Sequence, residues 1–148
     1  MSRRLQGRAV EPGRAEGVAL VCRQPLSLWG GFNPRTGEIV DRRHEQSGQV
    51  ATGRVLVLPR TKGSSTGSAC LLESIRSGTA PAAIITAEVD AIVALGSIVA
   101  DELYGRCVPA VTRSALRRAS VTWPATCPSP RMPTSPAWLS PTVRRYWE

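Results

Sequence analysis

The sequence has few of the residues that build metal centres. Its four cysteines, Cys22, Cys70, Cys107 and Cys127, form no Cys-x-x-Cys pair, and His44 is the only histidine. A zinc or iron–sulfur site made by this chain alone is therefore not expected, and no residue is assigned as a metal ligand. Cys22 and Cys70 lie in apolar runs and are interpreted as small buried hydrophobic residues.

Long apolar segments are also missing. The 148 residues suffice for one domain with a real core. They contain no run of about twenty apolar residues, which argues against a membrane span. Residues 1–8 lack the apolar centre of a secretory signal. We therefore expect a cytoplasmic protein without a membrane partner.

Lysine is nearly absent, because Lys62 is the only one and arginine supplies the rest of the basic charge. The formal net charge of +8 is unevenly spread. Residues 1–105 hold twelve basic against ten acidic residues, whereas residues 106–148 hold seven arginines against one glutamate. The first part shows no basic stripe with interleaved aromatic residues, so a nucleic-acid partner is not expected.

Alternating apolar runs predict an α/β layer architecture with some parallel strand pairing. The segment 17–22 is interpreted as an interior strand, and Gly96 is expected to end the second helix. Residues 97–104 fit either a helix or a strand. The expected elements are strands at 7–10, 16–22, 53–59, 80–87 and 108–111, and helices at 68–78 and 88–95.

The regular pattern ends near residue 112. Beyond it, six prolines interrupt the chain and three of the four tryptophans are found. We interpret residues 1–112 as the domain and residues 113–148 as an irregular or disordered Pro/Arg-rich tail. Replacement of the original C-terminus by a frameshift is a second explanation, which the coding DNA would test.

A small-residue turn lies between the expected strand at 53–59 and the expected helix at 68–78. In this turn, Gly63-Ser64-Ser65-Thr66-Gly67-Ser68, the backbone can approach a ligand, and the helix start offers N–H groups to an anion. These features predict a carboxylate or phosphate site. The alternative is that Ser64, Ser65 or Thr66 simply caps the helix. The turn lacks the Gly-Lys-Ser/Thr ending of a P-loop, since Lys62 precedes it.

A long polar segment, residues 26–41, carries turn signals and is expected to be functional or mobile. Trp29 and Phe32 flank Gly30-Gly31 in this segment. The two aromatic rings either pack the loop down or line a ligand cleft, and we favour the cleft. His44 is interpreted as a surface residue of a polar loop rather than a proton-transfer group.

The ordered series of these motifs resembles the swivel domain of the aconitase X family over roughly residues 7–112. The segments that carry the resemblance are residues 26–37, His44, and residues 53–59, 63–68 and 78–84. The resemblance implies a compact β/β/α swivelling domain. It also implies a separate large subunit or domain that holds an iron–sulfur cluster on its own cysteines. The family's known activities are dehydrations of small hydroxy acids, among them mevalonate 5-phosphate and cis-3-hydroxy-L-proline.

The resemblance also suggests roles for the turn residues. By similarity to the aconitase Gly-Ser-Ser turn, Ser64 is the expected general base, with Ser65 as second choice. The amides of Ser65, Thr66 and Gly67 are expected to stabilise its alkoxide or to hold the substrate carboxylate. The other expected substrate-binding residues are Lys62, Gly63, Trp29, Gly30 and Gly31.

One departure from the aconitase pattern concerns the cation that would help to stabilise the serine alkoxide. Aconitase follows its serines with an arginine, where this chain has Thr66, so Lys62, Arg60 or a partner residue is expected to replace it. The resulting hypothesis is a dehydratase small subunit. The high arginine content and the segment Leu103-Tyr104-Gly105 resemble bacterial sequences, which favours a hydroxyproline-type acid as substrate. The alternatives are a non-catalytic swivel-fold binding module or an inactive family member.

Overall fold

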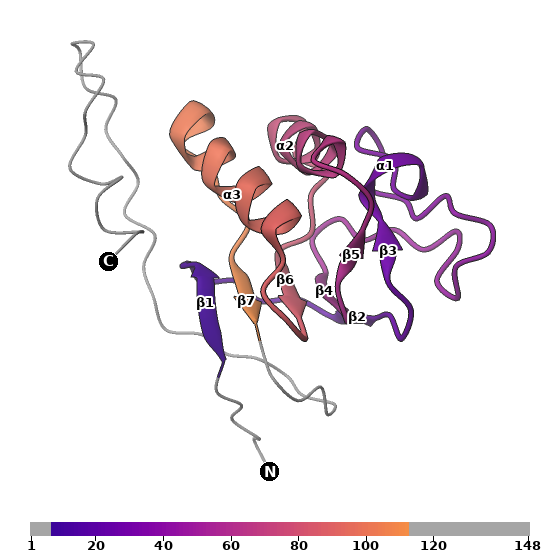
Figure 1. The fold of residues 1–148 in the computed structure, drawn as a ribbon. Coiled ribbons are helices and arrows are strands. Elements are labelled where there is room, and N and C mark those ends of the chain that lie inside the picture. The colour runs from indigo at the N-terminus through magenta and orange to yellow at the C-terminus, as the bar shows by residue number, and fades with distance from the viewer. Residues whose placement is uncertain (1–6, 113–148) are drawn as a thin grey trace, which may run out of the picture.

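The structure is a computed structural model that describes residues 7–112 (Figure 1). A five-stranded sheet has the strand order β1-β7-β6-β4-β2. Adjacent strands of this sheet are parallel, except that β1 is antiparallel to β7. The strands are β1 (Arg8–Glu11), β7 (Ala110–Thr112), β6 (Ala83–Thr86), β4 (Val55–Leu58) and β2 (Ala19–Val21).

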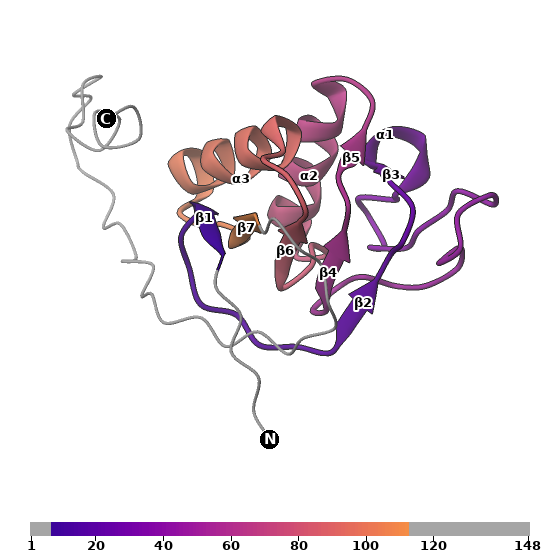
Figure 2. The same cartoon turned by 60° about the horizontal axis from the view of Figure 1, so that its bottom comes forward.

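A second, two-stranded sheet pairs β3 (Leu26–Ser27) with β5 (Thr61–Lys62) in parallel. A short helical segment, α1 (Leu28–Gly31), follows β3 directly. The long helices α2 (Thr66–Ser77) and α3 (Ala91–Tyr104) lie side by side on one face of the five-stranded sheet (Figures 1 and 2). The chain between β1 and β2 runs along the opposite face (Figure 2). The expected α/β layer architecture with parallel strand pairing is thereby confirmed.

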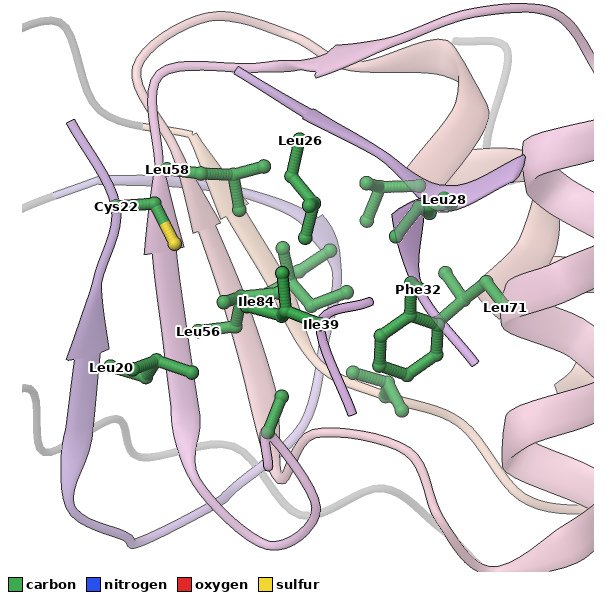
Figure 3. Close-up of a cluster of buried hydrophobic side chains, with 14 of the residues drawn as sticks. Leu20, Cys22, Leu26, Leu28, Phe32, Ile39, Leu56, Leu58, Leu71 and Ile84 are labelled. Atoms are coloured by element: carbon green, nitrogen blue, oxygen red, sulfur yellow. The ribbon is translucent and has the colours of Figure 1, made fainter. Parts of the chain in front are cut away.

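The core lies between the five-stranded sheet and the long helices. Leu56 and Ile84 point from the sheet toward Leu71 of α2, and Phe32 and Ile39 close the cluster from the loop after α1 (Figure 3). Each of these side chains is at most 3% exposed. Burial of a side chain of this size contributes about 1.5–3 kcal/mol, so the loop after α1 is firmly attached to the domain.

The two long helices begin and end at residues suited to those positions. Gly78 ends α2 as predicted, with its N–H bonded to the carbonyl of Ile75. Asp90 caps α3, because its carboxylate accepts hydrogen bonds from the N–H groups of Ile92 and Val93.

The prediction that Gly96 ends the second helix was wrong, since α3 continues without a break to Tyr104. Gly96 is instead the point of close approach between the two helices. A side chain there would lie 3.0 Å from the carbonyl oxygen of Ser68 and 3.1 Å from Leu71 of α2. Glycine is favoured at this position because it has no side chain, which lets the two helices pack this closely.

The prediction that residues 17–22 form an interior strand was also wrong. Strand β2 lies at the edge of the sheet and pairs with β4 alone. Leu20 and Cys22 face the core, but Val18 and Val21 are 72% and 45% exposed. The side-chain amide of Gln46 donates to the carbonyl oxygen of Val21 and covers part of this edge.

His44 is buried, which corrects the interpretation of a surface residue. Its Nε2 lies 3.3 Å from the carbonyl oxygen of Gln24, and its Nδ1 accepts the N–H of Gln46. The neighbouring Glu45 carboxylate accepts the N–H groups of Arg23 and Gln24. His44 and Glu45 therefore attach their loop to the chain between β2 and β3.

Two further expectations concern the limits of the domain. The predicted tail at residues 113–148 lies outside the described residues. None of the helices within residues 7–112 is long and apolar enough to cross a membrane.

Candidate functional site

The candidate site forms where two loops leave the small β3–β5 sheet. Because the two strands are parallel, the chain segments that follow them emerge at the same edge. A Cβ added to Gly63 would lie 3.6 Å from Ser27 Oγ, and one added to Gly67 would lie 3.5 Å from the Leu28 Cβ. The segment Leu28–Gly31 and the serine turn are thus brought together, as the site prediction requires.

Ser64 presents its hydroxyl on the exposed side of the turn. The hydroxyl donates to Thr66 Oγ1 at 3.1 Å, and the Thr66 N–H points to Ser64 Oγ at 3.4 Å. Ser65 occupies the cap position of α2 but makes no side-chain capping bond. The simple capping interpretation therefore accounts for the Ser64 hydroxyl in part and for the Ser65 hydroxyl not at all.

The backbone amides of the turn are partly engaged by the turn itself. The N–H of Gly67 donates to the Ser64 carbonyl oxygen at 2.9 Å, and the N–H of Ser68 donates to that of Ser65 at 3.0 Å. The group facing Ser64 Oγ is the Thr66 N–H. Of the three expected amides, that of Thr66 is therefore the best placed to stabilise charge on the Ser64 oxygen.

The turn is anchored from behind by α3. Gly67 is buried, and a Cβ added to it would lie 3.0 Å from Ile92 of that helix. Ser68 Oγ donates to the Ile92 carbonyl oxygen at 2.9 Å. These contacts hold the first turn of α2 in place, so the exposed hydroxyls sit on a rigid support.

The two basic residues near the turn have different partners. Lys62, at the end of β5, lies 3.9 Å from Asp41, measured from Nζ to Oδ2. Arg60, just before β5, is paired with Glu88 at 3.7 Å. Of these two basic residues, Lys62 is the one that immediately precedes the serine turn in the sequence. Sequence reasoning missed Asp41, since nothing local links residues so far apart in the chain.

The predicted aromatic pair is separated in the structure. Trp29 is 64% exposed beside Gly30, and it stays a candidate for ligand contact. Phe32 is 3% exposed and belongs to the core, so the expectation that it lines a cleft was wrong. Gly31 is buried next to Asp41, whose N–H donates to the Gly31 carbonyl oxygen.

The described cysteines do not fit a metal cluster. Cys22 is buried, which raises the pKa of its thiol to about 11, with a smaller contribution from Glu45. Burial also raises the pKa of Cys70. Within residues 7–112 no three His, Cys, Asp or Glu side chains are grouped to hold a metal ion.

Comparison with known proteins identifies the family to which the chain belongs. The sequence profile of the aconitase X swivel domain matches residues 4–121. The chain belongs to the aconitase X swivel domain family. A crystal structure of aconitase X from Thermococcus kodakaraensis in its holo-form superposes with a TM-score of 0.66 at 40% identity. The match covers 72% of this chain and 77% of that one.

Two curated relatives carry the same domain in different settings. The chain is 50% identical over 102 residues to cis-3-hydroxy-L-proline dehydratase of Pseudomonas aeruginosa, covering 69% of this chain but only 18% of that protein. It is 45% identical over 97 residues to the phosphomevalonate dehydratase small subunit of Pyrococcus furiosus, covering 66% of this chain and 72% of that subunit. The relatives are thus dehydratases or their small subunits.

Proposed function

We propose that this aconitase X swivel domain is the small subunit of a hydro-lyase that dehydrates a small hydroxy carboxylic acid, with Ser64 as the general base. The observation that carries the proposal is the position of Ser64. Its exposed hydroxyl lies at the meeting point of the two loops that leave the β3–β5 sheet, and it faces the Thr66 N–H.

The proposed reaction moves one proton and breaks one carbon–oxygen bond. Ser64 Oγ takes the proton from the carbon next to the carboxylate, a double bond forms, and the hydroxyl leaves as water after it is protonated. A serine acts as a base only when its alkoxide is stabilised. The Thr66 N–H and the Thr66 hydroxyl are in place for this, at 3.4 and 3.1 Å.

Lys62 is the proposed binding residue for the substrate carboxylate. It is half exposed at the end of β5, next to the turn that holds Ser64. A lysine ammonium has three N–H donors, so it can keep one acidic partner and still bind a carboxylate. Gly63, Gly30 and Gly31 add little bulk around this position, and Trp29 offers an exposed apolar face to the rest of the substrate.

A large partner subunit is part of the proposal. Phosphomevalonate dehydratase of Pyrococcus furiosus has a subunit named small, and the Pseudomonas aeruginosa dehydratase is a much longer chain. The iron–sulfur cluster that the family resemblance implies is assigned to that partner, because the cysteines described here do not fit it. When bound, such a cluster would supply a Lewis acid for the leaving hydroxyl. We favour cis-3-hydroxy-L-proline as substrate, in line with the 50% identity to its dehydratase.

The test is steady-state dehydration of cis-3-hydroxy-L-proline and mevalonate 5-phosphate by the chain co-purified anaerobically with its large subunit. Ser64→Ala should lower kcat by roughly 10²–10⁴-fold while the complex still elutes as one species. It should also abolish exchange of the substrate α-hydrogen with deuterium from the solvent. Ser65→Ala is the matched control, because its hydroxyl lies in the same turn but makes no capping hydrogen bond.

Each other result has a defined meaning. If Ser65→Ala abolishes exchange and Ser64→Ala does not, the base is Ser65. If the complex forms but turns over neither acid, the dehydratase proposal is wrong and a non-catalytic binding module becomes the better explanation.

A further inference from the structure

Asp41 makes contacts with three separate segments around the candidate site. Its N–H donates to the Gly31 carbonyl oxygen at 3.3 Å, and its Oδ1 accepts the N–H of Arg43 at 3.0 Å. Its other carboxylate oxygen, Oδ2, lies 3.9 Å from Lys62 Nζ. Through its main-chain N–H and its carboxylate, Asp41 thus links the end of α1, its own loop and the end of β5.

The two partners of this ion pair differ in how firmly they are held. The Asp41 side chain is 23% exposed, and one carboxylate oxygen is fixed by the backbone. The Lys62 side chain is 51% exposed and has a flexible four-carbon stem. The fixed carboxylate of Asp41 therefore favours positions of the Lys62 ammonium that lie close to it.

This ion pair has little to offer as a stabilising contact. Exposed pairs of this kind contribute about 0–1 kcal/mol to folding, and the separation here is at the long end for a salt bridge. Its position is more informative than its strength. Lys62 is followed directly by the turn that carries Ser64, and the Asp41 main-chain N–H is bonded to Gly31 at the end of α1.

We propose that Asp41 is a positioning residue, which holds the Lys62 ammonium where it meets the substrate carboxylate beside Ser64. The proposal rests on the proposed dehydratase function and adds to it a residue that acts only through Lys62. Asp41 attracts the ammonium through its charge at 3.9 Å, and the ammonium N–H groups remain for the substrate. Without Asp41, Lys62 would retain its charge but sample more positions, so the substrate would bind more weakly.

The chain allows a direct test of the pair, because Lys62 is its only lysine. A water-soluble carbodiimide activates the Asp41 carboxylate, and attack by the Lys62 amine forms an amide as the carbodiimide leaves as its urea. Peptide mass spectrometry of the folded full-length chain should then find one cross-link between the two residues, with the loss of one water. The link should be absent in Asp41→Asn. Its absence from the unmodified chain would overturn the proposal without touching the proposed function.

The role in binding is tested by a double-mutant cycle in the complex with the large subunit. Asp41→Asn is expected to raise KM for the substrate about fivefold, an effect typical of coupled neighbouring side chains, and to leave kcat nearly unchanged. In the Lys62→Met background the same substitution should change nothing. Asp41→Glu should restore part of the affinity. Glu73→Gln, which removes an exposed ion pair with Arg76 elsewhere on α2, is the matched control and should leave KM unaltered.

The cycle separates this proposal from the function on which it rests. If Asp41→Asn raises KM equally with and without Lys62, Asp41 does not act through Lys62 and the positioning role is wrong, although the dehydratase function stands. If the complex turns over neither acid, the proposed function fails and the substrate-positioning role fails with it, even where the cross-link forms.

Discussion

The buried carboxylate of Asp90 is bonded to Thr61 through both the backbone N–H and the side-chain hydroxyl, at 2.6 and 2.7 Å from Oδ2. Its other oxygen caps α3 through the N–H groups of Ile92 and Val93. Thr61 begins β5, whose next residue is Lys62. One side chain therefore fixes the strand that leads into the serine turn against the helix that supports the turn.

Replacing Asp90 should consequently destabilise the domain strongly. Asp90→Ala removes a helix cap, worth about 1 kcal/mol, and buried hydrogen bonds to a charged group, each worth about 1.5–3 kcal/mol. We expect a loss of about 4 kcal/mol, the low end of the sum of these contributions, in the free energy of unfolding, measured by urea denaturation. Glu88→Ala, at an exposed carboxylate two residues earlier, should change stability by less than about 0.5 kcal/mol. Equal effects of the two substitutions would show that Asp90 does not connect β5 to α3.

Local sequence patterns were sufficient for β4 and α2 on either side of the turn, although not for the short strands β3 and β5. The apolar run at 53–59 predicted β4, and the spacing of Leu71 and Ile75 predicted α2 with Gly78 at its end. The type of each of these elements is indicated by residues close together in the sequence, so its prediction needs no tertiary information.

Tertiary contacts decided the features that were predicted wrongly or missed. Gly96 continues α3 because α2 passes so close to it, and the ring of buried His44 contacts the carbonyl oxygen of Gln24, twenty residues away in the sequence. Asp41 reaches Lys62 across a separation of 21 residues in the sequence. Hydrophobic periodicity contains no signal for such contacts.

Glu11 should make the domain less stable as the pH rises. It is 2% exposed, and burial, with the negative charges of Asp101 and Glu102, raises its pKa from 4.5 to about 7. The folded state then binds more protons than the unfolded state between these two values, so stability falls as the pH rises through this range. Between pH 5.5 and 8 the Glu11 contribution should fall by at most about 2 kcal/mol.

The measurement is urea denaturation of the unmodified chain and Glu11→Gln at both pH values. Glu11→Gln should flatten the pH dependence, because the amide does not titrate. Glu16→Gln, at an exposed carboxylate, should leave it as it was. A pH dependence that survives in Glu11→Gln would assign the effect to another group.

Two glycines with the same backbone conformation should respond differently to alanine. Gly37 and Gly48 have φ values of +73° and +80°. A Cβ on Gly37 would collide with Thr52 Oγ1 and lie 2.7 Å from the Thr79 carbonyl oxygen, whereas a Cβ on Gly48 meets nothing within 4 Å. Gly48→Ala should cost about 1 kcal/mol for the left-handed conformation. Gly37→Ala should cost a further 1–3 kcal/mol or so for overpacking, measured by thermal or urea unfolding. Equal costs would mean that the loop yields freely around Gly37.

Trp29 should discriminate between the two candidate substrates. Its indole is 64% exposed beside Gly30 at the candidate site. The ring ammonium of cis-3-hydroxy-L-proline can stack on an indole face, and such a contact contributes about 0.5–1 kcal/mol at an exposed site. Mevalonate 5-phosphate has no cation to place there. Trp29→Leu in the complex is therefore expected to raise KM for the hydroxyproline about two- to fivefold, while Trp29→Phe keeps most of the affinity. A KM for cis-3-hydroxy-L-proline that is the same in Trp29→Leu as in the unmodified complex would place the ring of the substrate away from this side chain.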